Sequence, residues 1–213
     1  MHLKLDRNRL LSKVYISYLR LIWKTSSIEY EGEINDFSNS IIGFWHGDSY
    51  VMNLAINKLI SKDIDLQVVV TADKRGDYIE NILNYYGGKA LRMPDGIKMK
   101  GFLKELKTES KKENGTLAIA LDGPLGPFRE PKKIAPLLSN ESGKELIGFK
   151  IEYSNKIYLN KRWDKYSIPL PFTSIKINTV NFGVVTKDDL SNSIITCMPN
   201  SRACSIKAMI SAS

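Results

Sequence analysis

At 213 residues the chain is long enough for one domain, or for one domain with a small extension. Its 43% hydrophobic and 25% charged residues are typical of a globular protein and exclude a disordered or fibrous one. Lysine and arginine outnumber aspartate and glutamate by 31 to 23. The resulting net charge of +8 favours an anionic partner, whether a phosphorylated small molecule, an acidic carrier protein, an anionic membrane or nucleic acid.

Residue types that commonly bind metals are scarce. The two cysteines, Cys197 and Cys204, make neither a disulfide framework nor a complete zinc site. His2 and His46 are the only histidines. We therefore expect no metal site. The first residues show no signal peptide pattern, and no run of about 18 apolar residues predicts a membrane-spanning helix.

The first predicted element is an amphipathic helix over about residues 10–23. Basic residues accompany its apolar face, which repeats at i, i+3, i+4, i+7, i+8 and i+11 (Leu11, Val14, Tyr15, Tyr18, Leu19 and Ile22). Such a face packs on its own domain or lies at a membrane interface, and both can hold. We assign residues 1–27 to this helical extension.

Strands and helices alternate over the next part of the chain. After an edge-like segment at 28–31, we expect strands at 41–45, 66–70, 89–93, 116–121, 145–153 and 174–182. We expect helices at 48–62, at 77–87 with Asp77 as its N-cap, and at 98–113. This alternation predicts an α/β layered sandwich, with a largely parallel central sheet flanked by helices, over residues 28–190. Residues 191–213 form a polar tail that we leave untyped.

A row of lysines follows one face of the helix predicted at 98–113. Lys100, Lys104, Lys107 and Lys111 recur at i, i+4, i+7 and i+11. Such a row is either a solvated face or a surface that contacts an acidic carrier protein or a lipid.

His46 stands where the strand predicted at 41–45 ends. A glycine and Asp48 follow it directly. An imidazole has an unperturbed pKa of about 6.5, so a histidine at this position is suited to act as a general base near neutral pH. The alternative is a half-buried histidine that only donates or accepts a hydrogen bond, with Asp48 as the N-cap of the next helix.

A second polar loop, residues 122–127, follows the strand predicted at 116–121. Its sequence is Asp122-Gly123-Pro124-Leu125-Gly126-Pro127, with Arg129, Lys132 and Lys133 after it. Exposed N–H groups in a loop of this kind bind an anion, and the nearby cations can pair with phosphate. The alternative is a rigid crossover turn.

Three polar clusters therefore stand at predicted strand ends: His46 to Asp48, Arg92 with its loop, and the loop at 122–127. Ligands of an open α/β sheet bind beyond the carboxyl ends of its strands, so we expect the three clusters on one rim. No serine or cysteine is placed as a nucleophile beside His46. A base that acts directly on a substrate hydroxyl fits these residues better than a covalent mechanism does.

The order of these motifs resembles the lysophospholipid acyltransferase superfamily. The resemblance covers roughly residues 10–186. Within the superfamily, the chain is similar to a poorly characterised bacterial branch that carries Trp-His-Gly and Asp-Gly-Pro-Arg-Gly-Pro. It rests on Phe44-Trp45-His46-Gly47, Gly76-Asp77, Gly87-Gly88 with Arg92, the loop at 122–127, and the stretch from Trp163-Asp164 to Pro169-Leu170-Pro171-Phe172-Thr173.

The resemblance implies a glycerolipid acyltransferase-like fold and an acyltransferase of lipid metabolism. His46 maps onto the superfamily's base, which takes a proton from the acceptor hydroxyl, and Arg92 maps near an arginine that binds acceptor phosphate. The loop at 122–127 corresponds to the superfamily's Glu-Gly-Thr-Arg-Ser-like block. The donor is acyl-CoA or acyl carrier protein and the acceptor is a lysophospholipid or lipid-like molecule. We expect no cofactor and a peripheral location on the cytoplasmic side of a membrane. We also expect no nucleic-acid partner, because no zinc-finger spacing or RNA-recognition aromatic motif is present.

Two positions depart from the superfamily pattern. The superfamily has an acid five residues after its histidine, where this chain has Val51, and Asp48 is the candidate to replace it. The branch's arginine in the loop is Leu125 here, and Arg129 is the candidate substitute. The alternative function is a catalytically impaired protein of the same fold that binds lipids or acyl thioesters. The residues do not fix the oligomeric state.

Overall fold

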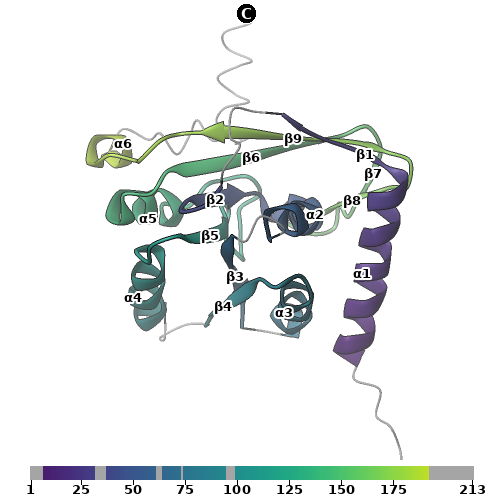
Figure 1. Cartoon of the computed structure of the whole chain (residues 1–213), viewed down its shortest axis with the longest axis horizontal. Helices are drawn as coiled ribbons and strands as arrows, with labels where there is room; N and C mark the ends of the chain where they lie inside the picture. Colours follow the sequence, from purple (N-terminus) through teal and green to yellow (C-terminus); the bar gives the residue numbers. More distant parts are fainter. Residues whose placement is uncertain (1–6, 32–36, 61–63, 73, 95–98, 192–213) are drawn as a thin grey trace, which may run out of the picture.

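The structure is a computed structural model that describes residues 7–31, 37–60, 64–72, 74–94 and 99–191. Its centre is a seven-stranded sheet (Figure 1). In spatial order the strands are β1 (Ser27–Glu31), β9 (Ser174–Asn181), β6 (Leu146–Tyr153), β2 (Ile41–Phe44), β5 (Gly115–Ala120), β3 (Asp65–Thr71) and β4 (Lys89–Met93). Cys197, Cys204 and the tail from residue 192 lie outside the described residues.

Five adjacent strands of the sheet, from β6 to β4, are parallel. β9 runs antiparallel to β6, and β1 pairs in parallel with β9. The prediction of a largely parallel sheet is therefore confirmed. β1 and β9 run opposite to the other five strands, and their pairing joins a segment near the start of the sequence to one near residue 180.

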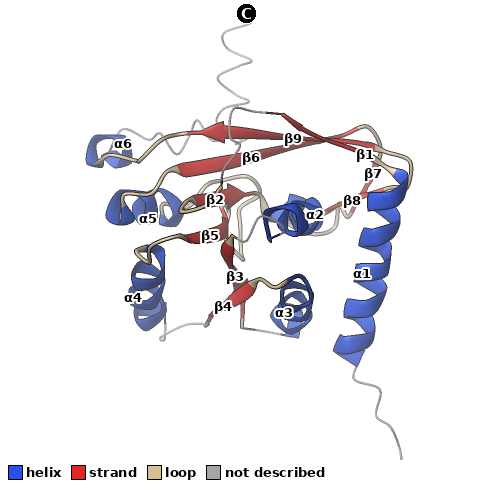
Figure 2. Cartoon of the chain, viewed as in Figure 1, coloured by secondary structure: helices blue, strands red, loops and turns tan. Residues whose placement is uncertain are grey.

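Helices cover both faces of the sheet (Figures 1 and 2). One face carries α1 (Arg7–Thr25), α2 (Ser49–Ile60) and α3 (Lys74–Tyr86), and the other carries α4 (Met99–Ser110) and α5 (Ile134–Ser142). Neighbouring strand residues therefore pack into different cores: Ile42 and Val70 face the first layer, whereas Ile41 and Val69 face the second. Burial on both faces explains why the inner strands read as continuous apolar runs.

The N-terminal amphipathic helix is confirmed, and it packs on its own domain. Leu19 and Ile22 are fully buried in the first core. The hydroxyl of Tyr18 donates to the carbonyl oxygen of Pro169 at 2.9 Å. Pro169 ends β8 (Ser167–Pro169), which pairs with β7 (Lys156–Tyr158) in a separate two-stranded sheet. No described helix has the length and apolar character that crossing a membrane requires.

Several elements differ from the sequence-based expectation. α3 begins at Lys74, so Asp77 lies in its first turn and is not its N-cap. The short helix η1 (His46–Asp48) precedes α2, which begins at Ser49. We did not predict α5, β7, β8 or α6 (Lys187–Ser191).

Candidate functional site

β2 and β5 are neighbours in the sheet, and the two loops that leave their carboxyl ends meet. The backbone N–H of His46 donates to Oδ1 of Asp122 at 3.0 Å, and the backbone N–H of Arg129 donates to Oδ2 at 3.3 Å. One carboxylate therefore ties the His46 turn to the segment that follows the loop at 122–127. Two of the three polar clusters expected on this rim come together in this way.

Asp122 is fully buried. Burial raises the pKa of its carboxyl to about 6, against the opposing effect of the N–H groups of His46 and Arg129. The side chain thus positions the backbone of the candidate base. The substrate-binding role that we expected of this loop stays a prediction.

Asp48 is held in a buried network. Its Oδ2 accepts a bond from Nη2 of Arg129 at 3.3 Å, and its Oδ1 accepts a bond from the hydroxyl of Tyr153 at 3.1 Å. Burial raises the pKa of Asp48, while the charges of Arg129 and Lys156 act in the opposite direction. Asp48 also stands directly before α2, in the N-cap position, but a capping role alone does not account for the bonds of its carboxylate to these two side chains.

The segment Arg162-Trp163-Asp164 packs on the His46 turn. The rings of His46 and Trp163 lie 5.4 Å apart at an angle of 41°. The carbonyl oxygen of Asp164 lies so close to Gly47 that a β-carbon at that position would overlap it. The tryptophan and aspartate motif was part of the family resemblance, but we gave it no place in the site. Its proximity to His46 comes from the connection between β7 and β8, neither of which we predicted.

Gly126 makes the same kind of contact from the loop at 122–127. A β-carbon there would lie 2.5 Å from the indole ring of Trp163, and the backbone has a φ of 71°, which favours glycine. Gly123 also has a positive φ, and Pro124 lines the cavity described below. Leu125, where the branch has arginine, is 87% exposed.

His46 lies at the wall of a cavity of about 520 Å³ between the sheet and the first helical layer. Leu11, Val14, Tyr15 and Tyr18 of α1 form one side of it. The other lining residues come mainly from β2, β3, α2, α3 and the β7–β8 segment and are largely apolar (among them Phe44, Met52, Val68, Val70, Ile79, Leu83 and Ile168). Arg162 also lines the cavity. His46 is partly exposed, although the Nδ1 atom of its ring is buried.

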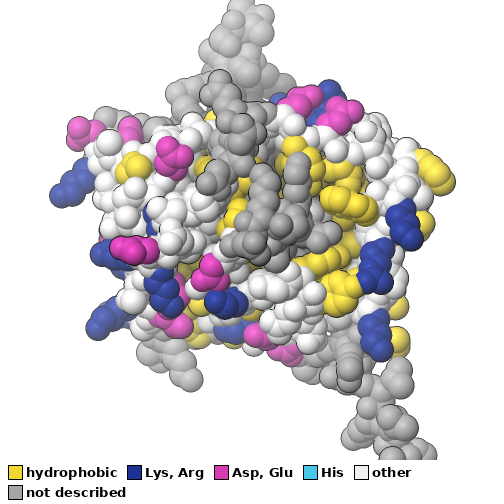
Figure 3. Space-filling model, viewed as in Figure 1, with side chains coloured by type: hydrophobic (Ala, Val, Ile, Leu, Met, Phe, Trp, Pro, Cys, Tyr) yellow, Lys and Arg dark blue, Asp and Glu magenta, His cyan; other side chains and the backbone are white. Residues whose placement is uncertain are grey.

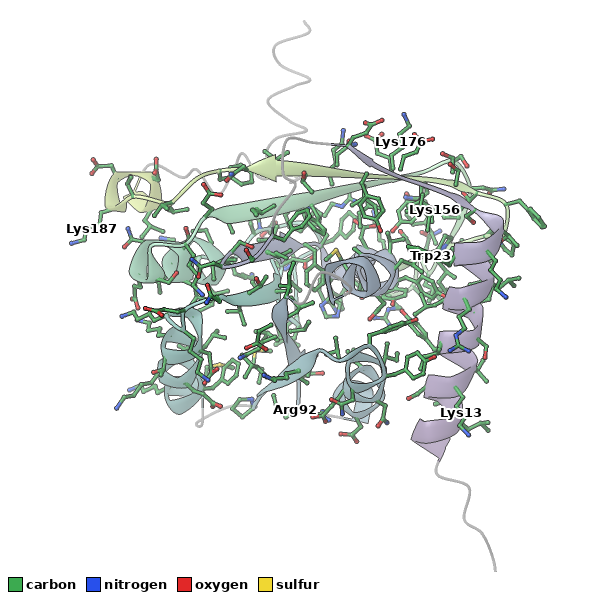
Figure 4. The ribbon with its side chains drawn as sticks, in the orientation of Figure 1. Lys13, Trp23, Arg92, Lys156, Lys176 and Lys187 are labelled. Atoms are coloured by element: carbon green, nitrogen blue, oxygen red, sulfur yellow. The ribbon has the colours of Figure 1, made fainter. Side chains whose placement is uncertain are left out.

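Arg92 and Lys132 lie elsewhere on the carboxyl side of the sheet. Arg92 donates to Thr71 O at 3.2 Å and to Asp77 Oδ1 at 2.9 Å, and it also pairs with Glu80. Figure 4 shows it beside β4 and α3, well apart from Lys156, whose charge acts on Asp48. Lys132 lines a smaller apolar cavity of about 180 Å³ under α4, together with Gly123 and Pro124. The ligand roles of Arg92 and Lys132 stay predictions.

Among the described residues, no group of three or more histidine, cysteine, aspartate or glutamate side chains is arranged to hold a metal ion.

The fold is similar to that of one solved structure, the 1-acyl-sn-glycerophosphate (LPA) acyltransferase PlsC from Thermotoga maritima. The chains are 17% identical, the match covers 92% of this chain and 82% of the other, and the TM-score is 0.50. No family model and no curated protein matches the sequence. At this identity the likeness shows a shared fold, and the expected glycerolipid acyltransferase-like architecture is confirmed.

Proposed function

We propose that this protein is an acyltransferase. It moves a fatty acyl chain from acyl-CoA or an acyl carrier protein to the hydroxyl of a lysophospholipid or a similar lipid, and His46 is the general base. The observation that carries the proposal is the largely apolar cavity of about 520 Å³ with His46 at its wall. Its size lies in the range of small-molecule sites, and its lining suits a hydrocarbon chain.

The chemistry requires one proton transfer and one displacement. The imidazole of His46 takes the proton of the acceptor hydroxyl while the oxygen attacks the thioester carbonyl carbon. The carbon–sulfur bond then breaks, and the imidazolium returns its proton to the departing thiolate. The products are an ester and a free thiol. A positioned base of this kind contributes about 10²–10⁴-fold to the rate.

Basic residues support an anionic acceptor and an anionic donor. Arg129 follows the loop that Asp122 ties to His46, and its side chain is 23% exposed, so it can contact an acceptor phosphate. Arg92 would have to exchange Asp77 or Glu80 for a phosphate. A groove of about 480 Å³ between α4 and α5 is lined by four lysines, which suit the phosphates of coenzyme A or an acidic carrier (Lys100, Lys104, Lys107 and Lys133).

The exposed side of α1 supports peripheral attachment to the cytoplasmic surface of a membrane. Leu10, Val14 and Leu21 are between 44% and 60% exposed, and their i, i+4, i+11 spacing places them on one face. Lys13 and Lys24 flank this face, and Lys13 projects away from the sheet (Figure 4). Figure 3 shows apolar and basic side chains side by side along this edge of the protein. This combination is typical of helices that lie on anionic lipid.

The test is acyl transfer from labelled acyl-CoA and acyl carrier protein to a pooled set of lysolipids and lipid-like acceptors. Wild type, His46→Ala and a matched His2→Ala control run side by side. We expect a labelled product from wild type and from His2→Ala and none from His46→Ala. Equal product from wild type and His46→Ala would remove His46 from the mechanism.

The second candidate function is a lipid- or acyl-thioester-binding protein that has lost catalysis, and Val51 at the expected position of the acid favours it. It predicts that wild type binds acyl-CoA in the cavity, that His46→Ala binds it equally, and that neither protein forms product.

A further inference from the structure

A histidine that acts as a base becomes a cation at the moment of reaction. A buried carboxylate beside it stabilises that cation and fixes the ring. The position five residues after His46 is Val51, which is fully buried in the apolar core. Some other carboxylate must therefore serve His46 if the histidine is a base.

Three aspartates lie close enough to be considered. The carboxylate of Asp122 accepts bonds from the backbone N–H groups of His46 and Arg129, so it holds the main chain of the turn. The carboxylate of Asp48 is bonded to the guanidinium of Arg129 and the hydroxyl of Tyr153. The third is Asp164.

Asp164 combines full burial with direct packing on the histidine turn. Its exposed fraction is 0%. The preceding residue, Trp163, places its ring 5.4 Å from the ring of His46, and the Asp164 backbone lies against Gly47. One short segment thus contacts both the ring of His46 and the backbone of Gly47 beside it.

The charge of Asp164 is fixed by Arg162. Nε of Arg162 donates to Oδ1 at 2.9 Å, and Nη2 donates to Oδ2 at 2.6 Å. Burial alone would oppose ionisation, but Arg162 and, after it, the charge of His46 lower the pKa of Asp164. The coupling is mutual, so an ionised Asp164 favours the protonated form of His46.

The other charged or titratable groups around this pair come from three elements. Asp122 lies on the loop after β5, Asp48 on η1 with Arg129 beside it, and Tyr166 follows Asp164 on its own segment. Asp122 shares its carboxylate with two N–H groups, and Asp48 is countered by Arg129. The charge of Asp164 interacts with that of His46, and Arg162, the salt-bridge partner of Asp164, lines the cavity.

We propose that Asp164, held by Arg162, is the positioning residue of His46 and stabilises its imidazolium in place of the acid absent at Val51. The catalytic part of this inference, that Asp164 supports His46 as a base, rests on the proposed function. The pairing of Asp164 with His46 can be measured without any substrate.

The chain has two histidines, so the imidazole signals of His46 can be followed by NMR in a His2→Gln background. In this background Asp164→Asn is expected to lower the pKa of His46, because the negative charge is removed while the shape is kept. Arg162→Gln is expected to raise it, because the opposing cation is removed and a protonated His46 becomes the remaining cation that favours an ionised Asp164. Asp65→Asn, at the amino end of β3, is the matched control and leaves the titration unchanged.

Opposite shifts from Asp164→Asn and Arg162→Gln support the pairing, because a merely structural role gives no such sign reversal. A folded Asp164→Asn protein with the control's titration overturns the proposal. If circular dichroism shows that Asp164→Asn does not fold, Arg162→Gln alone decides, and an unchanged pKa of His46 overturns the proposal.

Activity separates this inference from the proposed function. If wild type transfers acyl groups, Asp164→Asn is expected to lower kcat by about 10²-fold or more with little change in KM, and Asp164→Glu to restore part of it. A full kcat in Asp164→Asn overturns the positioning role. If wild type transfers nothing, the proposed function fails, whereas the NMR shifts still show whether the pair exists.

Discussion

His46 and Asp122 stand 76 residues apart in the sequence, yet the backbone N–H of one donates to the carboxylate of the other at 3.0 Å. The contact exists because β2 and β5 are parallel neighbours, so the segments that follow them leave the sheet at the same edge. A buried acid therefore holds the histidine through its main chain, and the imidazole stays available to the cavity.

This arrangement makes folding stability depend on pH through Asp122. Burial raises the pKa of its carboxyl from 3.8 to about 6. The folded protein thus keeps the proton that the unfolded chain loses, and stability falls as pH rises from about 4 to about 6. The total effect is about 3 kcal/mol. Urea unfolding across this window should show a steeper decline in wild type than in Asp122→Asn, which keeps the raised pKa of Asp48, and parallel curves would contradict the prediction.

Gly47 tests the packing between the histidine turn and the Trp163–Asp164 segment. Gly47→Ala places a β-carbon against the carbonyl oxygen of Asp164, and we expect a loss of about 1–3 kcal/mol in the free energy of unfolding. Gly101→Ala is the matched control, because α4 leaves open space around Gly101. This variant should gain about 0.5–1 kcal/mol. Equal effects of the two substitutions in chemical denaturation would refute the contact.

The cavity gives a prediction about donor chain length. Val68 lines it from β3 and is 4% exposed. Val68→Phe reduces the volume for a hydrocarbon chain in a strand that accepts aromatic residues. If the protein is an acyltransferase, competition between labelled donors of different chain lengths should shift toward shorter chains. An unchanged preference would place the acyl chain outside this cavity.

The exposed face of α1 predicts binding to anionic lipid. A Leu10→Glu/Leu21→Glu double variant should bind vesicles that contain anionic phospholipid more weakly than wild type, because it replaces apolar contacts with like charge. A Val180→Glu/Val184→Glu double variant, at two exposed apolar residues outside α1, adds the same charge and is the control that should bind as wild type does. Vesicle sedimentation measures both. A loss of the same size in the control would mean that net charge alone drives binding.

The sequence predicted the strands of the large sheet because apolar runs bounded by polar loops leave few other interpretations. It also placed His46 and Asp122 at strand ends, which was enough to bring them together once β2 and β5 were paired. We did not predict α5 because Pro136 stands in its first turn and its apolar pattern is short. Gly143, with a φ of 71°, was a signal for its end that could have been used.

The contribution of residues 162–164 to the site was harder to foresee. They lie between β7 and β8, two strands of three residues each that carry no clear alternation. Their approach to His46 depends on tertiary packing against Gly47 and Gly126, which no local pattern encodes. The sequence did show both glycines beside polar motifs, but their partner became visible only in three dimensions.

The pairing of β1 with β9 bears on the order in which the protein assembles during synthesis. α1 is made before the other described elements, but the strand that follows it pairs with residues 174–178. Tyr15 and Tyr18 of α1 bond to Tyr166 and Pro169. The contacts with Tyr166 and Pro169 span some 150 positions, so this part of the docking of α1 waits until β8 has been made, whereas its packing on Tyr50 of α2 can form earlier. A nascent chain that ends before β8 lacks Tyr166 and Ile168, so the wall of the cavity beside His46 is still incomplete at that stage.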